Sequence, residues 1–262
     1  MQVGELRALI EGGGVADRAF ADGVIRMKRG ELVTLHPLLV ETAARVHGAL
    51  RARIVDGLRG DELRSIFDAQ PEVDGEGRDH FVEEVLGIAY PPLEESTPGP
   101  EQIPYLPSGY AEIVHAFDAT GLRAGETFFD IGAGLGKAVM LAELLTGATA
   151  VGVELDAVLH AEATHAARAL GLRSAFTCGD ARTAPWPARA DVVFMYLPFT
   201  GTVLEAVMVR VDALAPRFVC AGTLDRARHP SLHVLGAPRS WLQIYAAGSS
   251  SVTDESSDPP TT

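Results

Sequence analysis

The stretch Thr127–Lys137, TFFDIGAGLGK, constrains the fold of this chain more than any other. Its first five residues are β-branched, aromatic or acidic, as in a strand, and an apolar run begins at Ala138. Between the two lie three glycines at alternate positions, Gly132, Gly134 and Gly136. Glycines at this spacing let the backbone turn through conformations that a Cβ forbids, and they leave its amides open to a ligand. The stretch therefore predicts a strand, a tight ligand-binding turn and the start of a helix.

Acidic residues occur near the ends of this strand and of the next two. Asp130 stands at the end of the first, and the apolar segment Ala148–Glu154 ends in an acid 24 residues later. This is close to the roughly 20-residue interval at which dinucleotide-binding folds place a carboxylate on ribose hydroxyls. A third segment, Ser174–Asp180, again ends in an acid. Because open α/β sheets bind ligands at the carboxyl ends of their strands, we expect the three carboxylates along one edge of a sheet.

The segments FFDIGAGLGKAVMLAELL, VGVELD, CGDAR and DVVFMYLPF resemble the class I S-adenosylmethionine-dependent methyltransferases, over roughly residues 105–245. The resemblance implies S-adenosyl-L-methionine as the cofactor. It also implies an α/β, Rossmann-like, doubly wound fold, in which a mostly parallel sheet carries an antiparallel closing strand. We expect Arg217–Ala221 to be the fifth strand, with His233–Leu235 and Trp241–Tyr245 as a closing antiparallel pair.

In that family the glycine-rich turn holds the methionine part of the cofactor, the acid after the second strand holds the ribose, and the acid after the third reads the adenine. The resemblance thus gives Glu154 the ribose role, and it gives Asp180 with Ala181 the adenine role. The complete set of expected cofactor-binding residues is Asp130, Gly132, Gly134, Gly136, Glu154, Leu155, Asp180, Ala181, Tyr196 and Tyr105.

The segment Ala89–Gly109 carries six prolines and two glycines in 21 residues, so it is expected to be a loop. Tyr105 and Tyr110 stand at its end, just before a predicted helix over Ala111–Ala119. The two rings are candidates to contact the methionine end of the cofactor or an acceptor, and the alternative is that they pin the loop to the domain. The Tyr-x-Pro-Ser pattern beginning at Tyr105 also resembles the histone lysine methyltransferases of the disruptor-of-telomeric-silencing type. That likeness covers only this loop and the glycine turn.

A fourth strand is predicted over Asp191–Tyr196, whose apolar run indicates burial on both faces. It delivers Tyr196-Leu197-Pro198-Phe199 to the crevice. Relatives that methylate amide or exocyclic base nitrogens have Asn or Asp where this chain has Tyr196. Because a phenol donates strongly and accepts only in part, an amide or adenine acceptor is disfavoured. Phe199 is interpreted either as a wall of the methyl site or as a core residue.

Methyl transfer from a sulfonium is an in-line displacement, so the protein mainly has to align the acceptor, methyl group and sulfur. No metal is expected. Tyr196 and Tyr110 are the candidate catalytic residues, with the task of orienting an amine or hydroxyl acceptor.

The charge balance restricts the partners. With 35 acidic and 22 basic side chains the formal net charge is −13, which repels polyphosphate backbones. We expect a small-molecule or peptide or protein acceptor and no nucleic acid. The chain has no apolar run long enough to span a membrane, so a soluble, cytoplasmic protein is expected. Cys178 and Cys220 fall in apolar predicted strands and are expected to be buried free thiols.

Two other functions share this pattern. A nicotinamide dehydrogenase of similar fold is disfavoured, because its fingerprint places glycine where this chain has Lys137. A non-catalytic relative that binds the cofactor as a sensor or scaffold fits the same residues and stays open.

Three regions are expected along the chain. Residues 1–100 form a helical segment that acts as a lid or a buttress, with its clearest helices at His36–Val55, Asp61–Ala69 and Asp79–Gly87. Residues 101–248 form the cofactor-binding domain. The tail, residues 249–262, is rich in Ser, Thr, Asp and Pro and is predicted to be disordered.

Overall fold

The computed structural model describes residues 37–70, 77–91, 99–196, 198–214, 217–221, 232–234 and 242–247. Its strands are β1 (Thr127–Ile131), β2 (Thr149–Glu154), β3 (Ala175–Cys178), β4 (Val192–Met195), β5 (Arg217–Ala221), β6 (Leu232–Val234) and β7 (Leu242–Ala247). They form one seven-stranded sheet in the order β3-β2-β1-β4-β5-β7-β6. The chain order reverses between β1 and β4, which is where doubly wound sheets open their ligand crevice.

The first five strands of the sheet run parallel, and β7 runs antiparallel to both β5 and β6. This is the Rossmann-like, mostly parallel α/β sheet that the sequence predicts. In the register of the parallel strands Asp130 pairs with Gly152, and Glu154 pairs with Cys178. The carboxyl ends of β1, β2 and β3 therefore meet along one edge of the sheet.

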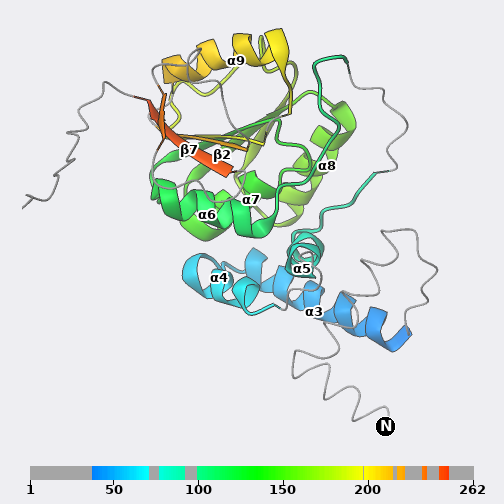
Figure 1. Ribbon diagram of the computed structural model, residues 1–262. Coiled ribbons are helices and arrows are strands. Elements are labelled where there is room, and N and C mark those ends of the chain that lie inside the picture. Colours follow the sequence, from blue (N-terminus) through cyan, green and yellow to red (C-terminus); the bar gives the residue numbers. More distant parts are fainter. Residues whose placement is uncertain are drawn as a thin grey trace, which may run out of the picture.

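Helices cover both faces of the sheet. Successive residues of a strand point to opposite sides, so neighbouring side chains of one strand enter different cores. Phe128 of β1 belongs to the core beneath α6 (Tyr110–Thr120), α7 (Lys137–Thr146) and α8 (Ala157–Ala169). Its neighbour Phe129 belongs to the core beneath α9 (Gly201–Leu214). Figure 1 shows α9 on one side of the sheet and α6 and α7 on the other.

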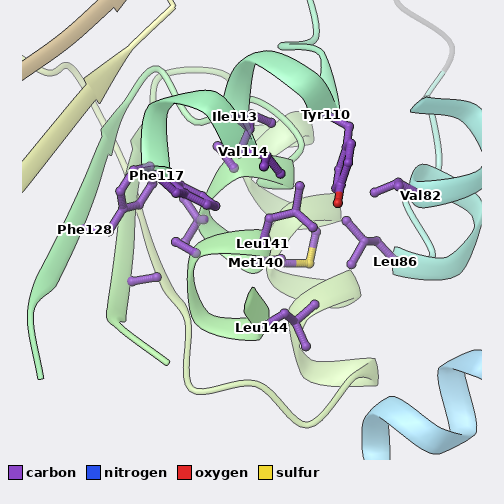
Figure 2. Close-up of a cluster of buried hydrophobic side chains, with 14 of the residues drawn as sticks. Val82, Leu86, Tyr110, Ile113, Val114, Phe117, Phe128, Met140, Leu141 and Leu144 are labelled. Carbon is purple, nitrogen blue, oxygen red and sulfur yellow. The ribbon is translucent and has the colours of Figure 1, made fainter. Parts of the chain in front are cut away.

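The N-terminal helices are α3 (Pro37–Val55), α4 (Gly60–Asp68) and α5 (Gly77–Leu86), within two residues of the predicted helices. Of these, α4 and α5 pack against α6 and α7 on the side away from the sheet, and α3 packs against α5 (Figure 1). Figure 2 shows Val82 and Leu86 of α5 pointing toward Tyr110 of α6 and Leu141 of α7. These side chains belong to one buried cluster, so the N-terminal helices share their core with the sheet domain.

One cysteine differs from expectation. Cys220 is a buried free thiol whose pKa is raised by burial, but Cys178 is exposed. The reason is that β3 is the edge strand of the sheet, and its last residue is left uncovered.

Some predictions fall outside the described residues, namely the tail over residues 249–262 and everything before Pro37. Among the residues that the structure describes, no helix is both long and apolar enough to cross a membrane.

His47 of α3 links two of the N-terminal helices. Its ring makes an edge contact with Phe81 of α5, at 5.1 Å between centroids. Burial, together with the charges of His80 and Arg51, lowers the pKa of His47 from 6.5 to about 4. A histidine whose pKa is lower in the folded state stabilises the fold above its unfolded pKa, and this stability is lost as the pH falls from about 6.5 toward 4.

We expect the free energy of unfolding to fall on acidification more steeply in the wild type than in His47→Gln. The difference between the two slopes is at most about 1.4 kcal/mol per pH unit, the cost of one pKa unit. Urea unfolding curves of both proteins at pH 7.5, 6 and 5 measure it. Equal slopes would show that His47 is not a buried neutral residue.

Candidate functional site

The glycine turn joins β1 to α7 in a left-handed backbone conformation. The φ angles of Gly132, Gly134 and Gly136 are +81°, +53° and +78°. A Cβ on any of them would lie 2.7 Å or less from another side chain. The covering residues are Pro198 over Gly132, Tyr105 over Gly134 and Phe176 over Gly136. All three positions therefore need glycine for both backbone conformation and space.

Glu154 connects the end of β2 to this turn. Its Oε2 accepts a hydrogen bond from the Gly134 amide at 2.7 Å, and its Oε1 accepts one from the Asp156 amide at 2.8 Å. Asp156 in turn caps α8 by accepting from the Val158 amide at 2.7 Å. Leu155, between the two acids, is exposed. The carboxylate predicted to hold ribose is thus fixed beside the glycine turn.

Asp130 and Glu154 form a pair of buried carboxylates at the ends of β1 and β2. Asp130 is only 4% exposed, and burial together with the neighbouring Glu154 raises its pKa to about 8. Burial also raises the pKa of Glu154, although amides of Asp156 and Gly134 partly offset the effect. Among the residues that the structure describes, no lysine or arginine forms an ion pair with either carboxylate. The pair is therefore a site where a cationic group would be favoured.

Asp180 follows β3 on the same edge of the sheet, next to Glu154. Its carboxylate is already engaged, because Arg182 Nη2 lies 2.6 Å from Asp180 Oδ2. This hydrogen bond holds the pKa of Asp180 below its usual value. Ala181 is half-buried beside it. The structure brings the third predicted acid to the right edge, but with its charge balanced by an arginine that the sequence analysis did not consider.

The side chain of Tyr105 packs against the glycine turn. Its ring is the nearest neighbour that a Cβ on Gly134 would meet, at 2.1 Å. Its hydroxyl oxygen accepts a hydrogen bond from the Leu135 amide, and burial raises the pKa of this phenol. The loop predicted to run above the crevice therefore touches the turn through Tyr105.

The same loop is joined to the segment after β4. The Ile103 amide donates to the Pro198 carbonyl at 2.9 Å, next to an antiparallel bridge between Gln102 and Phe199. Glu101 accepts from the Thr202 amide at 3.0 Å, at the start of α9. Two loops that are about 100 residues apart in the chain thus form one cover over the turn.

Tyr196 directly follows β4 and is half-buried. Its ring is stacked on that of Phe194, with 6.4 Å between the ring centroids. Burial raises the pKa of its phenol, and the charges of Glu112 and Asp79 raise it further. Phe199 is 7% exposed and belongs to the core beneath α9, so its core interpretation holds.

Tyr110 is not part of this site. It is 1% exposed, its hydroxyl donates to Asp68 Oδ1 at 2.9 Å, and its ring packs on Phe67 of α4. Figure 2 shows the ring directed toward α5. The predicted catalytic role of Tyr110 is therefore wrong. As the first residue of α6, it projects its side chain back toward the helices that precede it.

A buried ion cluster that was not predicted from the sequence lies behind the turn. Lys137 Nζ lies 2.8 Å from Asp79 Oδ1 and 2.8 Å from Glu83 Oε1, both on α5, and Lys137 is 5% exposed. Burial lowers the pKa of Lys137, but the two acids outweigh it and the pKa is raised. Tyr90, just after α5, also reaches the site, with its ring 6.4 Å from Tyr105. The available signal was a lysine at the start of a helix whose next five residues are apolar.

The chain matches no protein-family model, and a search of curated proteins found no match either. Solved structures similar to this chain include an RNA methyltransferase from Salinibacter ruber in complex with S-adenosyl-L-homocysteine. It is 20% identical, and the likeness covers 59% of this chain and 100% of that one with a TM-score of 0.43.

A TehB-like SAM-dependent methyltransferase from Corynebacterium glutamicum is 17% identical over 52% of this chain and 88% of that chain, with a TM-score of 0.40. A SAM-dependent methyltransferase from Thiobacillus denitrificans is 21% identical over 48% of this chain and 52% of that one, with a TM-score of 0.37. This chain thus spans about half of the latter protein.

We expect Gly134→Ala to destabilise the fold more than Gly171→Ala. Both glycines have left-handed φ angles, +53° and +66°, but a Cβ on Gly171 meets nothing within 4 Å. The conformational strain alone costs about 1–2 kcal/mol, and overlap with the Tyr105 ring should bring the cost at Gly134 to about 3 kcal/mol or more. Urea unfolding of the two variants measures the difference.

Tyr105→Ala in the Gly134→Ala background should recover part of the loss, because it removes the overlapping ring. Equal destabilisation at both glycines would show that Tyr105 does not cover the turn.

Proposed function

We propose that this chain is an S-adenosyl-L-methionine-dependent methyltransferase that acts on an amine or hydroxyl of a protein or small molecule. The observation that carries the proposal is the position of Glu154. Its carboxylate is joined to the glycine turn through the Gly134 amide and stands next to the buried Asp130, and no lysine or arginine of the described part of the chain is paired with either acid.

The residues present fit this cofactor. The glycine turn has the left-handed backbone conformation of a glycine-rich binding turn, and Glu154 is fixed beside it. Glu154 has the two oxygens needed to accept hydrogen bonds from both ribose hydroxyls, and Asp130 supplies negative charge for the cationic methionine end. Leu155 and Ala181 line the adenine end, where Asp180 is already paired with Arg182. When bound, the cofactor supplies an electrophilic methyl group on a positively charged sulfur.

The remaining task is to hold the acceptor in line with that methyl group and to keep water out. Tyr196 orients the acceptor through its hydroxyl, and the carboxylates of Glu112 and Asp79 near it favour a neutral or cationic acceptor over an anionic one. The net charge of −13 argues in the same direction, against nucleic acid.

A thermal-shift assay with S-adenosylhomocysteine, NAD and ATP tests the proposal. We expect S-adenosylhomocysteine alone to stabilise the protein, by about 2.7 kcal/mol at 100 times its dissociation constant. In Glu154→Gln the affinity should drop about tenfold or more, because a charge-assisted hydrogen bond to the ribose is lost.

Glu143→Gln is the matched control. Glu143 is also a buried carboxylate that accepts backbone amides, those of Arg173 and Ser174, but it lies at the other end of α7. It should lower stability without changing affinity. Absence of any shift with S-adenosylhomocysteine would refute the proposal, and binding without methyl transfer to any acceptor would favour a sensor or scaffold.

The affinity for the cofactor should depend on pH through Asp130. Since the pKa of this carboxyl is about 8 and the cationic ligand favours its ionised form, affinity should rise with pH up to about 8 and then level off. Below that pH the slope approaches about tenfold per unit for a single coupled proton. Calorimetry with S-adenosylmethionine at pH 6, 7, 8 and 9, on the wild type and Asp130→Asn, measures it. Parallel profiles for the two proteins would contradict the role of Asp130.

A further inference from the structure

Glu83 is the centre of a set of contacts behind the glycine turn. It lies on α5 and is 5% exposed. Its Oε1 lies 2.8 Å from Lys137 Nζ, at the first residue of α7. It also accepts a hydrogen bond from the hydroxyl of Tyr90, four residues past the end of α5. One buried carboxylate therefore ties the start of α7 to Tyr90.

Tyr90 contacts Glu83 through its hydroxyl and Tyr105 through its ring. Its hydroxyl is held by Glu83, and the residue as a whole is 43% exposed. Its ring centroid is 6.4 Å from that of Tyr105, with 48° between the planes, within the range of favourable aromatic pairs. The hydroxyl contact with Glu83 and the ring contact with Tyr105 together limit the orientation of the Tyr90 side chain.

Tyr105 completes the connection. Its hydroxyl accepts from the Leu135 amide and its ring covers Gly134. The contacts thus run from Lys137 through Glu83, Tyr90 and Tyr105 to Leu135. The two ends of this series of contacts, Lys137 and Leu135, are two residues apart in the chain.

We propose that Tyr90 is a positioning residue of the cofactor site: anchored through Glu83 to Lys137, it holds the Tyr105 ring over the glycine turn. Cofactor affinity then depends on α5, although α5 lies outside the sheet domain. This inference rests on the proposed function, because it concerns the same site.

Titration calorimetry with S-adenosylhomocysteine on the full chain tests it. Tyr90→Phe keeps the ring but loses the hydroxyl that Glu83 holds, and we expect its affinity to fall about three- to tenfold, as for one lost hydrogen bond. In a Tyr105→Ala background, Tyr90→Phe should cause no further loss, because the residue through which it acts is gone.

Tyr110→Phe is the matched control, since it also removes a hydroxyl bonded to a carboxylate, that of Asp68, but away from the turn. It should lower the melting temperature and leave affinity unchanged. Wild-type affinity in Tyr90→Phe, or an equal further loss in the Tyr105→Ala background, overturns the inference alone. Failure of the wild type to bind S-adenosylhomocysteine overturns the proposed function and this inference together.

Discussion

The absence of any side chain at three positions of one turn is the constraint on which the rest of the site depends. Between β1 and α7 the backbone passes so close to Pro198, Tyr105 and Phe176 that even a methyl group would not fit. These three covering residues come from the loop after β4, the loop before α6, and β3. Because dense packing transmits displacement, a shift of the turn must be accompanied by shifts in all three.

Two groups of buried charges flank this turn. One group pairs a lysine with two acids, and the other consists of two acids. Lys137 is compensated by Asp79 and Glu83, and removing either acid would leave it less well compensated in a poorly solvated place, which is costly. Asp130 and Glu154 stand together at the strand ends, and their pKa values are raised rather than lowered. The first group is therefore compensated within the protein, whereas ionisation of the second is disfavoured until a cation compensates it. This difference separates structural acids from the acids suited to a ligand.

Much of the fold was predictable from local patterns. Strand and helix positions agree to within a few residues, because apolar periodicity and the glycine turn act over short distances. The site was predictable in part: Asp130, Glu154 and Asp180 do reach one edge, since parallel strands align their carboxyl ends. The pairing of Asp180 with Arg182, the burial of Tyr110 and the exposure of Cys178 were not predicted, because each depends on which neighbouring element covers that residue.

The sequence by itself determined the order of the elements, the turn that only glycine can form, and the acids at successive strand ends. These follow from backbone sterics and from the alternation of side chains along the chain. Only the tertiary structure decided that α5 supplies the partners of Lys137 and that Glu101 closes the loop before α6 onto the start of α9. Such contacts join residues 54 to 101 positions apart, and a residue's type and local neighbours carry no information about which distant side chain will face it.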